Sequence, residues 1–117
     1  MSEEAIDLKE ALERIQDDKD LLLELFEIYC EDHATKMGEL RTAVSHNDVE
    51  QVKRIAHSLK GASGNISAKK LHVAFLGLEQ QAKGNDLTRA SQTIAEIDRI
   101  YDEAKASMAK IKQDFKK

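Results

Sequence analysis

The sequence predicts an all-α fold: an antiparallel up-down-up-down four-helix bundle with a short N-terminal lid helix, formed by residues 1–117 as a single domain. Its 117 residues contain no Pro, no Trp and only five Gly, so the residues typical of strands and tight turns are scarce. Apolar residues recur at spacings of three and four along most of the chain, as on one face of a helix. The breaks between these stripes span two to four residues, which favours antiparallel helices that bury their faces together.

The first two helices are separated by a polar break. The first is expected from Leu8 to Ile15 with Asp7 as its cap, and it is short enough to be a lid on the bundle. The second is expected from about Lys19 to Ser45, and at 1.5 Å per residue it would be about 40 Å long. Its apolar stripe comprises Leu22, Leu25, Phe26, Tyr29, His33, Met37, Leu40 and Val44.

The third and fourth helices are expected to meet at a glycine-containing segment. Asn47 with Glu50 three residues later makes a start like a capping box for the third helix. This helix is expected to weaken within residues 61–65, and Ser67 is expected to cap a fourth helix that ends at Gly84. The inward faces comprise Val49, Val52, Ala56 and Leu59 in the third helix, and Leu71, Ala74, Phe75, Leu78 and Ala82 in the fourth.

The last helix is expected to open at Asn85-Asp86 and carries a heptad stripe. Its members are Leu87, Ala90, Ile94, Ile97, Tyr101, Ala104, Met108, Ile111 and Phe115. Such a stripe could dimerise as a coiled coil. Because three other helices in the chain need a partner face, the intramolecular bundle is favoured and we expect a monomer.

Several classes of protein are disfavoured by composition. The single cysteine, Cys30, cannot form an internal disulfide and belongs to no cluster with zinc spacing. The acidic start lacks the apolar region of a secretory signal, and no apolar run approaches the roughly 20 residues that a membrane span needs. We therefore expect a cytoplasmic protein that binds no metal or cofactor of its own and does not contact the membrane.

Charge is distributed unevenly along the chain. The 28 residues between Glu50 and Glu79 contain no carboxylate and five cations, so the remainder has a net charge of −9 against −4 overall. The cations are Lys53, Arg54, Lys60, Lys69 and Lys70. A basic stretch indicates a surface for an anion. Nucleic acid fits poorly, since the chain is acidic and the stretch lacks interleaved exposed aromatics. A small anion or an acidic protein partner fits better.

His57 is the candidate reactive residue. It falls outside the apolar face of its helix, beside Lys53 and Lys60, whereas His33 is expected in the core, His46 at a helix end and His72 on the surface. A neutral imidazole has one nitrogen with a free lone pair and can act as a nucleophile. A carboxylate beside the other nitrogen would fix the tautomer, and Glu79 can supply it. Lys60 can balance negative charge on a transferred group.

Two glycines near His57 need an explanation, because each costs about 1 kcal/mol relative to Ala within a helix. A helix end would account for Gly64 but not for Gly61. A surface kept flat for a bulky partner would account for both.

The segment from Ala56 to Ile66 contains the pattern H-x-L-K-G-x-S, and Leu78-Glu79 follows at the end of the next helical stripe. Together with Ala68 and Leu71, these residues closely resemble the histidine-containing phosphotransfer (HPt) domains of bacterial phosphorelays. The arrangement of helical stripes is similar to that family over nearly the whole chain. Ser67 departs from the family, since many members have Gly there.

The resemblance implies that His57 accepts the phosphoryl group, that Lys60 is the cation near it, and that Gly61 leaves room for a receiver domain's aspartate. Glu79 matches the glutamate that orients the histidine in the related domain of chemotaxis kinases. The docking surface is expected to comprise Lys53, Gly61, Gly64, His72 and Leu76.

The expected function is a phosphorelay intermediate: a phosphoryl carrier without autonomous kinase activity. Its expected partners are response-regulator receiver domains and a sensor or hybrid histidine kinase, with magnesium only at the receiver's site. One alternative is a helical adaptor that docks receivers without being phosphorylated. Another is a hydrolase with His57 as base, although no motif places a nucleophilic Ser or Cys and a convex helix edge offers no pocket.

Overall fold

A computed structural model of the chain describes residues 5–116, so residues 1–4 and 117 of the expected domain lie outside it. The described residues form five helices and no strand. The helices are α1 (Leu8–Arg14), α2 (Lys19–Ser45), α3 (Val49–Asn65), α4 (Lys69–Lys83) and α5 (Ala90–Phe115). The all-α prediction is therefore confirmed.

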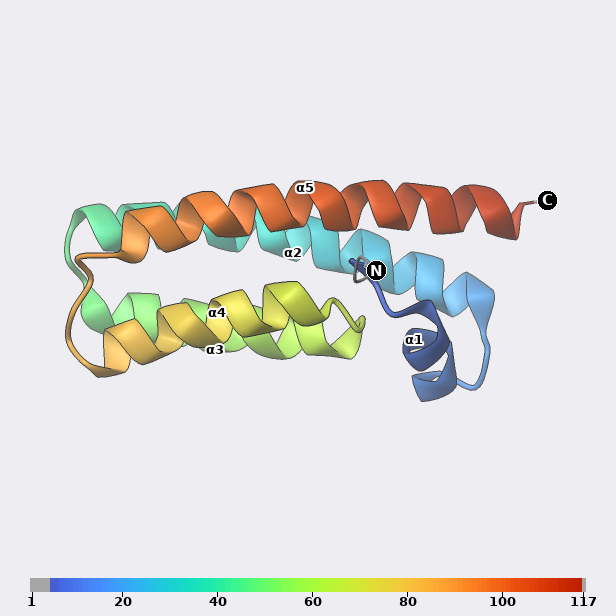
Figure 1. Ribbon diagram of the computed structural model, residues 1–117, viewed down its shortest axis with the longest axis horizontal. Coiled ribbons are helices and arrows are strands. Elements are labelled where there is room, and N and C mark those ends of the chain that lie inside the picture. Colours follow the sequence, from blue (N-terminus) through green and yellow to red (C-terminus); the bar gives the residue numbers. More distant parts are fainter. Residues whose placement is uncertain (1–4, 117) are drawn as a thin grey trace, which may run out of the picture.

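The four long helices form an antiparallel bundle in which each packs on its neighbours in chain order and α5 closes on α2. The bundle is elongated, with extents of 47 × 29 × 19 Å. Helices α2 and α5, of 27 and 26 residues, extend beyond the shorter α3–α4 hairpin, as Figure 1 shows. Helix α1 lies at that end, next to the α3–α4 turn, as expected of a lid. None of the helices in the described range is long and apolar enough to span a membrane.

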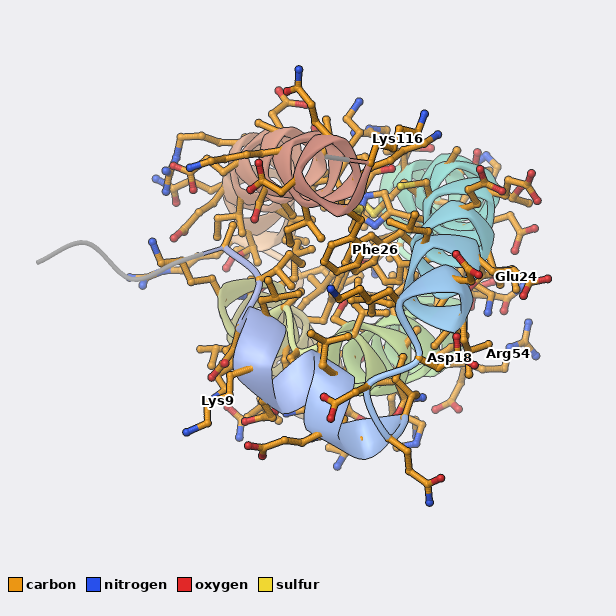
Figure 2. The ribbon with its side chains drawn as sticks, turned by 90° about the vertical axis from the view of Figure 1, so that its right-hand side faces the viewer. Lys9, Asp18, Glu24, Phe26, Arg54 and Lys116 are labelled. Carbon is orange, nitrogen blue, oxygen red and sulfur yellow. The ribbon has the colours of Figure 1, made fainter. Side chains whose placement is uncertain are left out.

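The core is continuous and contains a buried polar cluster around Tyr29. Figure 2 shows Phe26 of α2 pointing between the helices, while Glu24 points to solvent. Tyr29 Oη lies 2.8 Å from Ser63 Oγ and 3.1 Å from His33 Nδ1. The His33 ring stacks on that of Tyr101 at 3.6 Å. His33 is 2% exposed, so the prediction that it lies in the core is confirmed.

Two predicted helix caps are wrong. The cap of α3 is Asp48, whose Oδ1 accepts a hydrogen bond from the N–H of Gln51, while Asn47 adopts a left-handed conformation with φ of 51°. Ser67 is also left-handed, with φ of 57°, and α4 begins after Ala68 without a side-chain cap. A glycine would adopt this conformation without strain. The Ser67 hydroxyl instead donates to Glu10 Oε1 at 2.9 Å.

Three predicted helix boundaries differ from the structure. Helix α3 does not weaken after Gly61 but continues to Asn65. The first helix ends at Arg14, one residue early. The last begins at Ala90, because Asp86 Oδ1 accepts hydrogen bonds from Thr88 N and Oγ1 and so holds a separate turn. The α4–α5 connection is therefore longer than predicted.

Helix α1 is tied to the α3–α4 turn by polar contacts. The N–H of Asp7 donates to the carbonyl of Ser67 at 3.0 Å, and Lys69 Nζ lies 3.2 Å from Asp7 and 3.0 Å from Glu10. Hydrogen bonds from Lys69 first, then from Ser67 and Arg14, lower the pKa of Glu10 to about 2. The lid thus braces the far end of the hairpin.

The buried His33 predicts a specific acid sensitivity. Burial lowers its pKa to about 4, from 6.5, so the folded state favours the neutral ring. The contribution of this neutral ring to the stability of the folded state is fully present above pH 6.5 and is lost as the pH falls from 6.5 through 4. Between pH 7 and pH 4.5, the free energy of unfolding should fall by about 2 kcal/mol less in His33→Gln than in the wild type. Urea unfolding of both proteins at the two pH values measures this difference. Equal pH dependence in both proteins would contradict this assignment.

Candidate functional site

His57 lies on the solvent-facing edge of α3, with its side chain 68% exposed. Its neighbours Val52, Ala56 and Leu59 are fully buried in the bundle, so the helix holding the ring is rigid. His57 Nδ1 lies 2.7 Å from Glu79 Oε2. Because an ionised carboxylate only accepts hydrogen bonds, Nδ1 must be the protonated nitrogen of the ring. In the neutral ring the lone pair of Nε2 is then free.

Glu79 comes from α4 and is only 3% exposed. Its Oε1 accepts a hydrogen bond from Lys60 Nζ at 2.8 Å, and its Oε2 accepts the one from His57. The Lys60 hydrogen bond is the main cause that holds the pKa of Glu79 below its usual value; burial opposes it and the His57 bond adds to it. The carboxylate is therefore ionised at neutral pH although it is buried.

Lys60 makes a contact that the sequence did not suggest. Its ammonium lies 2.8 Å from Glu79 Oε1, the carboxylate oxygen that does not contact His57. An ammonium has three donors, and Glu79 uses one of them. Lys60 thus orients Glu79 directly and retains donors for a second anion.

The two glycines have different surroundings. A Cβ on Gly61 would meet nothing within 4 Å, so this position is open to a partner. A Cβ on Gly64 would lie 3.2 Å from His72 Nδ1. His72 Nδ1 donates to the carbonyl of Lys60 at 2.9 Å, so the ring packs across Gly64 and is half-buried. The close approach of His72 thus gives Gly64 a packing reason that sequence reasoning missed, while its expected place in the docking surface stays a prediction.

The basic stretch does not form one surface. Lys53 and Arg54 border a pocket of about 500 Å³ beside His57. Lys69 instead pairs with α1, and Lys70 borders a separate hollow over α4 and α5. Among the five cations of the basic stretch, only those on α3 are therefore close to His57.

Sequence reasoning missed Lys83, which borders the same pocket as His57. The signal was available, since Lys83 follows Glu79 by four residues and so lies on the same face of α4. Leu76, the remaining member of the expected docking surface, is half-buried on α4. In the described range, no group of three or more His, Cys, Asp or Glu side chains is placed to hold a metal ion.

Comparisons with known proteins found a matching family model and a similar solved structure. The family model of the Hpt domain matches residues 24–107. The structure is similar to the crystal structure of histidine-containing phosphotransfer protein B (HptB) from Pseudomonas aeruginosa PAO1, with a TM-score of 0.82 and 25% sequence identity. That match covers 97% of this chain and 96% of the other. No curated protein sequence matches the chain at a significant level.

The hydrogen bond to Glu79 predicts the tautomer of His57. We expect ¹⁵N chemical shifts at pH 8 to show the Nδ1–H tautomer in the wild-type protein, because only that form donates to the carboxylate. Glu79→Ala should shift His57 toward the Nε2–H form, whereas Glu79→Gln, which keeps an acceptor oxygen, should shift it less. The exposed His46 is the internal control. An unchanged His57 in Glu79→Ala would contradict the assigned contact.

Proposed function

Because the chain belongs to the family of Hpt domains, which carry phosphoryl groups on histidine in phosphorelays, we propose that His57 is its phosphoryl-accepting residue. Such domains interact with the kinases and receiver domains of two-component systems. One observation carries the assignment to His57: an exposed ring whose Nδ1 is held by a buried carboxylate, so that Nε2 is free to react.

The proposed step transfers a phosphoryl group from an aspartyl phosphate to nitrogen. The Nε2 lone pair of His57 attacks phosphorus, the bond between phosphorus and the aspartate oxygen breaks, and the carboxylate leaves with the electron pair. No proton needs to be removed, because Nε2 has none. The phosphorylated ring is positively charged, and Glu79 stabilises it through Nδ1–H. The reverse steps pass the group to another receiver.

Lys60 and Gly61 are proposed to assist the transfer. Lys60 has donors left for the equatorial oxygens of the phosphoryl group, where charge must be stabilised in the transition state. Gly61 leaves space one turn from the ring, where a receiver can bring its aspartate close. The magnesium ion that phosphoryl transfer to aspartate requires would come with the receiver.

The remaining properties are proposals drawn from the sequence. We propose a cytoplasmic, monomeric carrier without autonomous kinase activity, since the sequence has no glycine-rich nucleotide loop. The heptad face of α5 is buried within the bundle, with Ile94, Ile97 and Ala104 at most 6% exposed, and so is used by internal packing.

The site assignment predicts one phosphorylation site. We expect His57→Gln to abolish labelling from a phosphorylated receiver without unfolding the protein, because the side chain of His57 is 68% exposed. The adduct should be acid-labile and base-stable, as expected of a phosphorus–nitrogen bond. His46→Gln, at an exposed position outside the site, is the matched control and should label normally. Label that persists in His57→Gln would overturn the assignment, and normal docking without any label in the wild type would favour the adaptor.

Gly61 predicts a conflict between stability and function. Its Cβ position is empty, so Gly61→Ala should raise the free energy of unfolding by about 0.5–1 kcal/mol through helix propensity. The same methyl group should slow transfer from a receiver, because it occupies space needed by the partner. Chemical denaturation and single-turnover transfer measure the two effects. A variant that is more stable and transfers at the wild-type rate would remove Gly61 from the docking surface.

A further inference from the structure

We propose that Lys83, at the C-terminal end of α4, is a specificity residue that binds a carboxylate side chain of the receiver domain docking on His57. The inference rests on the function proposed above, because it assigns a partner contact to the same face of the molecule. It concerns the pocket beside His57 rather than the residues of the motif.

The register of the α3–α4 hairpin brings Lys83 to this pocket. His57 contacts Glu79, and Gly64 contacts His72, so each step forward along α3 is matched by a step back along α4. One turn before His57 is Lys53, and one turn after Glu79 is Lys83. Both lysines border the pocket of about 500 Å³ that also contacts His57. Two cations from different helices therefore lie one helical turn along the hairpin from the His57–Glu79 pair.

Lys83 is the cation of this pocket that lacks an intramolecular partner. Lys53 Nζ lies 3.5 Å from Glu50 Oε2, and Arg54 donates to Gln51 Oε1. Within residues 5–116, Lys83 makes no hydrogen bond or ion pair. Its charge lowers the pKa of Glu79, but less than the hydrogen bonds from Lys60 and His57 that already hold that carboxylate. The ammonium of Lys83 is thus available to an anion from outside.

The pocket fits a side chain of the partner better than the phosphoryl group itself. Its volume of about 500 Å³ greatly exceeds that of a phosphoryl group, and Lys83 lies one turn away from the ring that would bear it. A carboxylate on the docking face of a receiver is complementary to the unpaired cation. Such rim charges increase specificity and association rate more than they stabilise the free protein.

Glu50 gives the proposal a second, independent variant. Its carboxylate is 82% exposed and borders the same pocket, where it partly neutralises Lys53. An incoming carboxylate would meet this negative charge. Glu50→Gln should therefore strengthen docking, and a gain of affinity cannot result from unfolding.

The test measures docking of the receiver that accepts phosphoryl groups fastest from the wild-type protein. Calorimetric titrations at about 50 mM and about 300 mM NaCl compare the wild type with Lys83→Gln and Glu50→Gln. Lys110→Gln, an exposed lysine of α5, is the control for net charge. We expect Lys83→Gln to weaken binding about three- to five-fold at low salt and to flatten its salt dependence. Glu50→Gln should tighten binding about two-fold, and Lys110→Gln should match the wild type.

Two outcomes would overturn the role of Lys83. If Lys83→Gln binds the receiver as tightly as Lys110→Gln does, Lys83 serves only the end of α4, where a cation favours the helix dipole. The second outcome is that Lys83→Gln changes the rate at which phosphoramidate phosphorylates His57 with no receiver present. Lys83 would then act on the ring or its phosphoryl group rather than on the receiver. If the wild type transferred its phosphoryl group to no receiver, the proposed function itself would be overturned. The two outcomes above leave that function intact, so failure of the Lys83 role and failure of the proposed function are distinguishable.

Discussion

The buried carboxylate of Glu79 is the interaction on which the site depends. An ionised group that is 3% exposed is costly unless its oxygens are hydrogen-bonded, and here one oxygen accepts from Lys60 and the other from His57. The bond from His57, which helps to compensate this burial, also selects the tautomer of the histidine. A single carboxylate therefore links the stability of the α3–α4 hairpin to the reactivity of the ring.

The hairpin needs a fixed register to hold this geometry, and contacts away from His57 supply it. His72 bonds the carbonyl of Lys60 and packs across Gly64, one to two turns beyond the ring. Further along, Ser67 and Lys69 at the turn bond to α1. The lid helix is thus part of a chain of contacts that keeps α4 from sliding along α3. A slip of one residue would rotate Glu79 by about 100° away from His57.

Much of this was accessible from the sequence, because its signals are periodic or local. The stripes of α2 and α5 and the Asp7 cap follow from spacing and residue type, as does the exposure of His57. The predictions that Asn47 and Ser67 cap helices were wrong because both residues adopt the left-handed conformation in a turn. Short polar side chains are common both at helix caps and at such turn positions, so residue type alone does not distinguish the two. The contact between Lys60 and Glu79 was not predicted, for another reason. Which carboxylate of a neighbouring helix a flexible lysine contacts depends on packing between helices, and no spacing within one helix encodes that.

The structure also separates two uses of positive charge that the sequence presents as one basic stretch. Lys60 and Lys69 are committed to internal carboxylates, where they orient the histidine and fasten the lid. The cations that remain by the ring are Lys53 and Arg54, which belong to the stretch, and Lys83 at the end of α4, which lies outside it. Folding thus uses some lysines to build the site and leaves others at the pocket beside the ring. A cation's position across the hairpin, rather than its membership of a basic segment, decides which role it has.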